Sequence, residues 1–397
     1  MRVVIVGGGV AGPALGLALQ RAGIESVVLE RRADPDPEAG SYFTVSPNGL
    51  DALDTVGALH LAREAGFSSR RNAMYGATGR LLGRLSLGVP LDDGTVPLTM
   101  KRSRLAVLLA EEAERRGVEV HRGARVIRVA GGPEGVSATL EDGTTVHGDV
   151  LVGADGVHSL VRRTIDPAAP AGRYVGLTNF GGITRATPVA GTLEPEAWHF
   201  VFGSRAFIGA HPTPAGDVVW FANVPRDEIS REERQTTTDE QWRRWLLDLV
   251  REDAGPAAEL IRHGQLELAG DNTYDLPHVP TWSRDRMVVI GDAAHAPSPS
   301  SGQGASMALE DAVVLAQALR DSPDVPAALA AYETSRRSRV EKIVAVGERS
   351  GSSKIPGRIG RRFQEVVLRL VFRYAVTEKN TAWMSGHRID WDEHLTV

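Results

Sequence analysis

The chain has 397 residues, 45 basic and 50 acidic side chains, and a formal net charge of −5. This mild acidity argues against nucleic acid as a partner, because nucleic acid usually recruits a basic face. The absence of cysteine excludes a thiolate nucleophile, a disulfide and a cysteine-ligated metal site, and we expect no metal. The start shows no signal peptide, and no run of about 18 uncharged apolar residues occurs. A cytoplasmic protein without a transmembrane segment is therefore expected.

The first elements are typical of a βαβ unit. The short β-branched run Arg2–Val6 indicates a buried parallel strand. A helix over Pro13–Ala22 and a strand over Ser26–Glu30 follow it. Ser46 opens another helix, and short strands are expected from about 72 to 98. Beyond them the pattern predicts a helix over Ser103–Arg116 and strands over Val118–His121, Arg125–Ala130, Val136–Leu140 and Val146–Gly153.

The second half combines an antiparallel region with a return to the parallel pattern. Met287–Ile290 resembles the first strand, and a helix over about 304–320 follows it. Gln241–Arg251 is expected to be helical, as are 324–349 and 358–376 at the end of the chain. Alternation and turn residues predict antiparallel strands over Tyr174–Thr184, Ala197–Phe202, Phe207–His211 and Val218–Val224.

This order predicts an α/β fold in which a discontinuous Rossmann-type domain carries an inserted antiparallel β-sheet. We expect the dinucleotide domain to comprise 1–72, 99–171 and 282–350, and a β-rich substrate domain to comprise 73–98 and 172–281. The remaining 351–397 form a C-terminal helical segment. Its basic amphipathic helix docks on the protein itself, on a partner or on a membrane.

The segment Gly7–Gly12 follows the first strand and opens the first helix in the pattern G-x-G-x-x-G. Gly7 allows the tight turn, and Gly9 lets the backbone approach a pyrophosphate. Gly12 lets the helix pack on the strand. This context favours a dinucleotide site over a glycine turn without a ligand.

The residues around this turn extend the expected site. The helix start at Val10 and Ala11 offers free N–H groups to phosphates. Glu30 ends the second strand, where a carboxylate is placed for the ribose hydroxyls of an adenosine. Arg31 beside it belongs to the same candidate cofactor-binding set. These features alone do not separate FAD from NAD.

A second strand end separates the two cofactors. Gly291 and Asp292 follow the strand Met287–Ile290, and a second glycine-rich helix start comes next. Two such turns suit a cofactor with two ends to hold, which favours FAD. Asp292 is placed to accept from a ribityl hydroxyl, while N–H groups near Gly302 and Gly304 face the pyrimidine edge of the flavin.

The motifs resemble those of the class A flavoprotein monooxygenases, the family of para-hydroxybenzoate hydroxylase and salicylate hydroxylase. Three segments carry the resemblance, namely Gly7–Gly12, Gly153–Arg162 and Gly291–Gly304, in the expected order. The resemblance implies that Arg102 contacts FAD and that Asp155 belongs to a motif implicated in FAD and NAD(P)H binding.

The same resemblance assigns the turn before the last long helix to the reactive part of the flavin. Pro299 would lie near C4a, and Pro299, Gly302 and Gly304 form the expected catalytic set. Ser41–Ser46 would lie beside a mobile isoalloxazine. The cofactor set also includes Gln303, Ala305 and Ser306. Relatives often carry Asn where this chain has Ser306.

The resemblance implies a monooxygenase with tightly but non-covalently bound FAD. NADH or NADPH would reduce the flavin, and a C4a-hydroperoxide formed with O2 would transfer one oxygen atom to an aromatic or electron-rich small molecule. An FAD oxidase or dehydrogenase on the same fold stays an alternative, as does a flavin-containing ligand-binding protein. The chain is expected to be a monomer or a dimer.

Aromatic residues of the antiparallel region are the candidates for a substrate pocket. Trp198, Phe200 and Phe202 alternate in one strand and so share a face, and Trp220 lies in a later strand. Such residues line an apolar pocket or fill a core, and the sequence leaves both open. His199, His211 and Asn223 are further polar candidates, each of which also fits a purely structural role.

Overall fold

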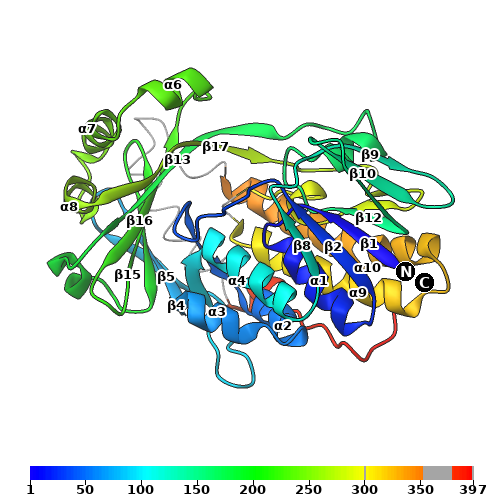
Figure 1. The fold of residues 1–397 in the computed structure, drawn as a ribbon. Coiled ribbons are helices and arrows are strands. Elements are labelled where there is room, and N and C mark those ends of the chain that lie inside the picture. Colours follow the sequence, from blue (N-terminus) through cyan, green and yellow to red (C-terminus); the bar gives the residue numbers. More distant parts are fainter. Residues whose placement is uncertain (299–300, 352–377, 396–397) are drawn as a thin grey trace.

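The computed structural model describes residues 1–298, 301–351 and 378–395. Two lobes are visible in Figure 1, one built on a parallel sheet and one on a large, mainly antiparallel sheet. No helix in the described part of the chain is long and apolar enough to cross a membrane. The predicted mixed α/β architecture is confirmed, whereas the predicted domain boundaries stay a prediction.

A six-stranded sheet forms the centre of the first lobe, in the order β18-β19-β12-β1-β2-β8. β1 pairs in parallel with β2 on one side and with β12 on the other. Its residues Val3, Val4 and Ile5 are fully buried, as expected for an apolar run covered on both faces. The strands are β1 (Arg2–Val6), β2 (Glu25–Glu30), β8 (Glu119–Arg122), β12 (Val150–Gly153), β18 (Ser283–Arg284) and β19 (Met287–Val289).

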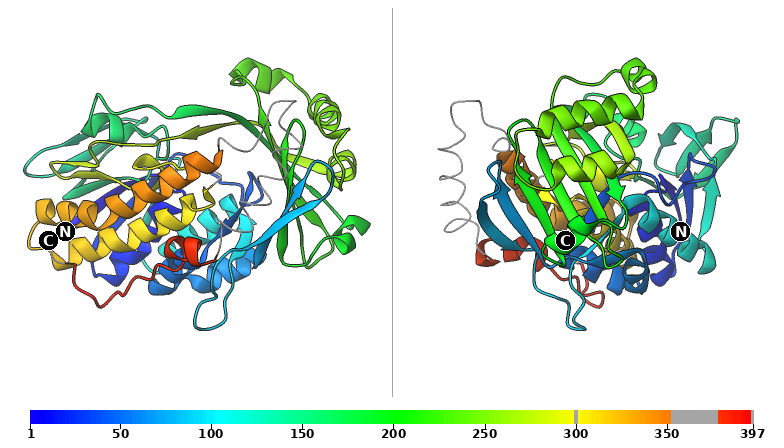
Figure 2. Two further views of the ribbon diagram at one scale, coloured as in Figure 1. Left: turned by 180° about the vertical axis from the view of Figure 1, so that it is seen from behind. Right: turned by 90° about the vertical axis from the view of Figure 1, so that its left-hand side faces the viewer.

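Helices of this lobe pack on one another as well as on the sheet. α9 lies between α1, α2 and α10, and Figure 2 shows α9 and α10 side by side. α12 packs on α2. The helices are α1 (Ala11–Arg21), α2 (Pro47–Thr55), α3 (Leu59–Ala65), α4 (Arg102–Arg115), α5 (Leu160–Ile165), α9 (Gly304–Asp321), α10 (Val325–Gly351) and α12 (Glu378–Ser385).

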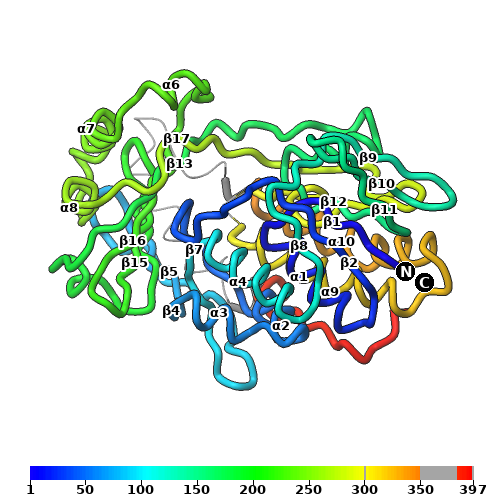
Figure 3. The backbone as a smooth tube through the Cα atoms, in the orientation of Figure 1, coloured from blue at the N-terminus to red at the C-terminus, as the bar shows by residue number. Residues whose placement is uncertain are grey.

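A seven-stranded sheet forms the second lobe, in the order β17-β13-β16-β15-β14-β5-β6. The long pair β13 and β17 runs from the first lobe into this sheet (Figure 3). The strands are β5 (Arg71–Gly76), β6 (Leu81–Ser86), β13 (Arg173–Thr184), β14 (Ala197–Phe202), β15 (Phe207–Pro212), β16 (Val218–Pro225) and β17 (Gln265–Asp275).

The two faces of the seven-stranded sheet have different neighbours. One face packs on α7 (Asp239–Val250) and α8 (Ala257–His263), which follow α6 (Arg231–Thr236); α7 and α8 lie across the sheet in Figure 2. The other face meets a small sheet, β3-β7-β4. Its strands are β3 (Tyr42–Val45), β4 (Gly66–Ser68) and β7 (Leu98–Lys101).

The predicted strand Val146–Gly153 is wrong as a single element. The chain breaks at Asp149, so that β11 (Thr145–Gly148) joins a sheet with β9 (Val126–Gly131) and β10 (Val136–Leu140), while β12 joins the parallel sheet. The Asp149 carboxylate accepts a hydrogen bond from the Arg2 N–H at 2.6 Å, which fixes the break beside β1. β17 was not predicted, and the predicted helix 358–376 lies outside the described residues.

Candidate active site

The turn between β1 and α1 is closed by contacts that exclude a side chain. Gly7 has φ +113°, and a Cβ there would lie 2.3 Å from the Ala154 carbonyl oxygen. A Cβ at Gly12 would lie 1.9 Å from the Gly7 carbonyl oxygen. At Gly9, in contrast, no described atom lies within 4 Å of such a Cβ. The fold itself therefore requires Gly7 and Gly12, whereas Gly9 faces open space that a ligand can fill.

The start of α1 has unpaired N–H groups that fit a phosphate. α1 begins after Val10 without a cap from any described side chain and without an acidic residue in its first turn. The first N–H groups of a helix have no partner inside it and carry the positive end of its dipole. Val10, Ala11 and Gly12 thus surround a site suited to a pyrophosphate.

Glu30 lies directly against the glycine turn. Its Oε2 accepts from the Gly8 N–H and its Oε1 from the Arg32 N–H, both at 2.8 Å. A carboxylate has about four acceptor positions, so both oxygens keep a free lone pair for ribose hydroxyls. Arg31 next to it is exposed.

Asp155 follows β12 and is engaged with the start of α5. Its Oδ2 accepts from the N–H groups of Leu160 and Val161 at 2.7 and 3.2 Å. Its Oδ1 is buried without a partner in the described chain. Burial raises the pKa of Asp155, although the Ser159 hydroxyl and those N–H groups oppose the change. Its role toward a cofactor stays a prediction, because the observed contacts are internal.

The first and third motifs lie together in space. Gly291 (φ +57°) follows β19, and a Cβ there would lie 3.1 Å from the Ala308 Cβ and 3.5 Å from the Ala11 Cβ. The turn therefore fits between the starts of α1 and α9. The next residue, Asp292, pairs with Arg102 at 3.1 Å across 190 positions of sequence. Both side chains keep exposed surface, which leaves them accessible to a cofactor.

The turn before α9 is only partly covered by the described residues, because Pro299 lies outside them. Gly302 has φ +62°, and among the described residues no atom is found within 4 Å of where its Cβ would lie. A Cβ at Gly304 would make ordinary contacts, the shortest 3.5 Å to Pro297 Cγ. Protein packing therefore does not demand glycine at 304. α9 starts there, with Ala305 in its first turn and no described side chain as its cap.

Gln303 and Ser306, two predicted cofactor residues near the start of α9, have side chains that form hydrogen bonds within the protein. The Gln303 amide donates from Nε2 to Ser46 Oγ at 3.0 Å, and Ser306 Oγ accepts from the Ser46 N–H at 3.1 Å. Both residues are almost fully buried. They join the turn to the start of α2, so contacts with a flavin would come from their backbones.

An aromatic cluster covers the face of the seven-stranded sheet that points away from α7 and α8. Trp198 and Phe200 have ring centroids 5.7 Å apart, and Phe221 lies 5.4 Å from Trp198. Phe202 and Phe207 extend the cluster along the same face, 5.1 Å apart. Phe200, Phe202 and Phe221 keep exposed surface. The structure thus brings the three predicted aromatic residues of β14 together.

Trp220 is not part of this aromatic face. It belongs to the apolar cluster beneath α7 and α8, and its indole N–H donates to Thr184 Oγ1 at 3.1 Å. Neighbouring residues of a strand point to opposite faces, so Trp220 and Phe221 cannot both line the same pocket. Of the two, Phe221 lies on the aromatic face, and only Trp220 was named as a candidate from the sequence, although alternation within β16 offered the choice.

Trp198 is anchored by a buried chain of hydroxyl groups. Its indole N–H donates to Thr44 Oγ1 at 3.0 Å, and Thr44 is linked through Thr99 to Ser69. Ser69 Oγ lies 2.8 Å from His211 Nε2. His211 Nδ1 lies 2.8 Å from the Pro212 carbonyl oxygen, an acceptor, so Nδ1 carries the proton and Nε2 accepts. The chain joins the aromatic face to the small sheet β3-β7-β4.

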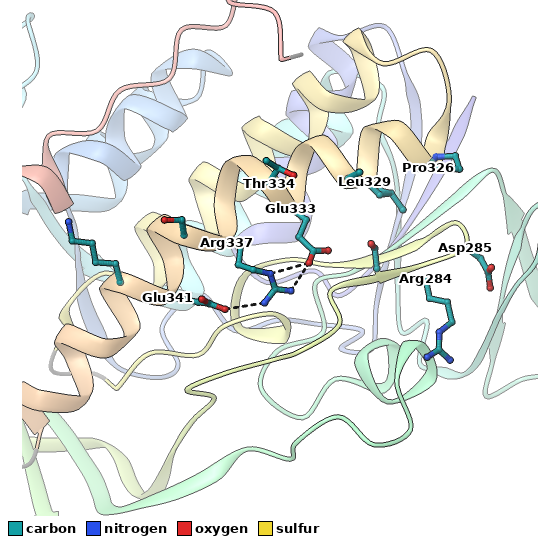
Figure 4. A pocket seen from close by; sticks show the side chains of 12 residues that line it. Arg284, Asp285, Pro326, Leu329, Glu333, Thr334, Arg337 and Glu341 are labelled. Carbon is teal, nitrogen blue, oxygen red and sulfur yellow. Dashed lines mark hydrogen bonds and ion pairs between the residues drawn. The ribbon is translucent and has the colours of Figure 1, made fainter. Parts of the chain in front are cut away.

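A groove of about 900 Å³ elsewhere on the surface is lined by residues of α10 and β18 (Figure 4). Arg337 there pairs with Glu333 at 2.6 Å and with Glu341 at 3.1 Å. It also donates to the Val279 carbonyl oxygen. No predicted site residue lines this groove, and its central cation is already paired, so we do not include it in the candidate site.

The adjoining glycine turns at the edge of a parallel sheet define a dinucleotide-binding protein, and comparison with known proteins gives its family. A model described as FAD binding domain matches residues 1–346, and the chain belongs to this family. The aurachin C monooxygenase/isomerase of Stigmatella aurantiaca is 30% identical over 397 residues, covering 98% of this chain and 96% of that protein. The 2-heptyl-3-hydroxy-4(1H)-quinolone synthase of Pseudomonas aeruginosa is 31% identical over 370 residues, covering 91% and 90%.

A solved structure gives the same result. Klebsiella pneumoniae HpxO complexed with FAD and uric acid has a TM-score of 0.83 to this chain at 25% identity, with 97% of each chain covered. The resemblance to class A flavin-dependent monooxygenases is therefore confirmed. The protein is an FAD-dependent monooxygenase that uses NAD(P)H and O2 and acts on a small molecule.

Substitutions at Gly12 and Gly9 of the first turn should have different effects, the first on stability and the second on FAD affinity. Gly12→Ala should lower the free energy of unfolding of the apoprotein by about 1–3 kcal/mol, because its Cβ overlaps the Gly7 carbonyl. Gly9→Ala should leave that quantity unchanged and weaken FAD binding about tenfold or more, because only a ligand occupies its free space. Denaturant unfolding and fluorescence titration with FAD measure the two effects. Unchanged FAD affinity in Gly9→Ala would place the pyrophosphate elsewhere.

His211 predicts a pH dependence of stability. Burial lowers its pKa from 6.5 to about 4, against the opposing hydrogen bond to Pro212. Between these values the unfolded chain binds more protons, so the free energy of unfolding should fall as the pH falls, by up to about 3 kcal/mol. In His211→Gln, which has no titrating ring, this part of the dependence of the free energy of unfolding on pH should disappear. Equal slopes for both proteins between about pH 7 and pH 4.5 would contradict a neutral His211.

Proposed function

We propose that this monooxygenase inserts one oxygen atom into a planar, largely apolar aromatic substrate that lies against the aromatic face of the seven-stranded sheet. The observation that carries the proposal is the set of partly exposed rings on that face, Phe200, Phe202 and Phe221. Rings of this kind stack on a flat substrate and exclude water around it. Bound FAD, reduced by NADH or NADPH, supplies the oxidising chemistry.

Polar groups on this face favour an uncharged substrate that donates hydrogen bonds. The cross-strand register gives Asn72 and Asn179 the same facing as Trp198 and Phe221. The side-chain oxygens of Asn72 and Asn179 are buried without a partner in the described chain. A buried acceptor of this kind is costly unless a ligand satisfies it. His211 adds no charge, since burial lowers its pKa to about 4.

The relatives support an apolar heterocycle as the substrate. The name of the quinolone synthase describes a product with a flat ring, one N–H group, one carbonyl, one hydroxyl group and a heptyl chain. Its flat ring and heptyl chain match the aromatic residues of this face, and its few donors match the few acceptors there. Uric acid, present in the HpxO complex, has polar groups around its whole rim and would need more partners. We therefore favour a quinolone-like substrate over urate for this chain.

We assign the cofactor and catalytic roles as follows, each as part of the same proposal. Gly302 and Gly304 present backbone N–H groups to the flavin, and Pro299, outside the described residues, is the third catalytic residue of the proposal. The division into a discontinuous FAD-binding domain and a β-rich substrate domain is proposed with the same boundaries. We also propose a cytoplasmic location, where NAD(P)H is available. The cofactor set is Gly7, Gly9, Val10, Ala11, Gly12, Glu30, Arg31, Arg102, Asp155, Asp292, Pro299, Gly302, Gln303, Gly304, Ala305 and Ser306.

Isotope labelling tests the reaction. Quinolones and simple phenols are screened for stimulation of NAD(P)H oxidation, and positive compounds are turned over under 18O2. One labelled oxygen atom per product is expected. An oxidised product without labelled oxygen would identify an oxidase or dehydrogenase. NAD(P)H oxidation that releases only peroxide would show that the compound is bound but not oxygenated, and binding without NAD(P)H oxidation by any compound would favour a ligand-binding protein.

Phe221 and Trp220 form a matched pair for the substrate site. Phe221→Ala should weaken substrate binding about tenfold, because an aromatic wall is lost from the proposed pocket. Trp220→Phe should cost about 1 kcal/mol of stability and leave substrate affinity unchanged, since Trp220 packs beneath α7 and α8. The dissociation constant for substrate and the thermal midpoint separate these effects. A larger affinity loss in Trp220→Phe would put the pocket on the other face.

A further inference from the structure

A buried polar chain connects α9 to both segments that are expected to border the flavin. Asn48 donates from Nδ2 to Glu310 Oε1 at 2.5 Å and to Gln303 Oε1 at 3.1 Å. Gln303 in turn donates to Ser46 Oγ at 3.0 Å. Asn48 and Glu310 are fully buried and lie 262 positions apart in the sequence. Nothing in the oxygenation chemistry itself requires this chain.

The carboxylate of Glu310 sets the direction of every bond in the chain. Burial alone would raise its pKa, but Arg336 and Arg339 outweigh burial and lower the pKa to about 2. An ionised carboxylate only accepts, so Asn48 must present its NH2 group to it. The second N–H of Asn48 then requires the oxygen of Gln303, which turns the Gln303 NH2 group toward Ser46.

Glu310 is itself held from the opposite side. Arg339 contacts both of its oxygens, at 2.8 and 2.9 Å, and Arg336 pairs with it at 2.6 Å. Arg339 also donates to the carbonyl oxygens of Trp383 and Met384, at 2.8 and 2.6 Å. The polar chain therefore extends from the end of α12 to the turn that precedes α9.

We propose that Glu310 is a positioning residue for the cofactor, acting through Asn48 on the turn at Gln303 and on the segment that ends at Ser46. The inference rests on the proposed placement of these two segments beside the flavin. It assigns no chemical step to Glu310. The carboxylate instead fixes where the backbone N–H groups of the turn point, and these groups are the part of the protein proposed to face the flavin.

FAD affinity tests the proposal without any substrate. Asn48→Ala leaves Glu310 paired with both arginines, while Gln303 loses its donor. Gln303→Met interrupts the chain at the next link and keeps its shape. Both variants should bind FAD about tenfold more weakly than the wild type, the change expected when a buried group loses its partner. Both should also shift the visible absorption band of the bound flavin in the same direction.

Gln317→Leu is the matched control. Gln317 is buried in the same helix and donates to the Asp390 carbonyl oxygen at 2.7 Å, but it has no bond to Asn48 or Glu310 in the described chain. This variant should lower the thermal midpoint of the apoprotein and leave both FAD affinity and the flavin spectrum unchanged. If Asn48→Ala behaves like Gln317→Leu, the chain is purely structural and the proposal is overturned.

A double-mutant cycle tests the route through Asn48. Glu310→Gln should weaken FAD binding in the wild-type background and add nothing in the Asn48→Ala background, because contacting residues on one path are not additive. Full additivity would overturn the route. Where Glu310→Gln does not fold, the comparison of Asn48→Ala and Gln303→Met with the control decides the matter. A failed substrate proposal does not change these readouts, and Gly9→Ala shows separately whether FAD binds at the first turn.

Discussion

Two adjacent carboxylates of α9, Glu310 and Asp311, are completely buried, and the segments around the candidate site are attached to them. Asp311 accepts from the Gly291 N–H at 2.9 Å and lies 2.5 Å from His295 Nε2. Glu310 accepts from Asn48 at the start of α2. The turn at Gly291 and the start of α2, which are distant in sequence, are thus both held by hydrogen bonds to adjacent residues of α9.

Two buried carboxylates require positively charged partners, because a buried charge without a partner is strongly destabilising. Arg336 bridges the two carboxylates, at 2.6 Å to Glu310 and 2.8 Å to Asp311, and is itself fully buried. Removing one member of a buried pair typically costs about 3–5 kcal/mol. α9 and α10 therefore cannot slide past each other without breaking these bonds, and the turns at the site inherit that rigidity.

The sequence alone was sufficient to predict features that depend on residues close together in the chain. The glycine at position 7 needs its positive φ, and the order of strand, turn and helix predicted the glycine turn without any structure. Sequence spacing offers no comparable signal for Asn48 and Glu310, since their meeting depends on how α2 packs on α9. The sequence could not decide between Trp220 and Phe221 for a related reason. Alternation shows that they face apart, but only the position of α7 and α8 shows which face is covered.

The structure separates what is fixed in this enzyme from what can vary. The cofactor turns are held by backbone contacts and buried charges, where a single substitution leaves an unpaired group. The aromatic face relies on stacking, which tolerates exchange of one ring for another at modest cost. On the proposed placement of the substrate against this face, substrate preference can change through Phe200, Phe202 or Phe221 without disturbing the turns. A relative solved with uric acid and another named for making a hydroxyquinolone fit this division, because one FAD-binding scaffold can carry different substrate-binding residues.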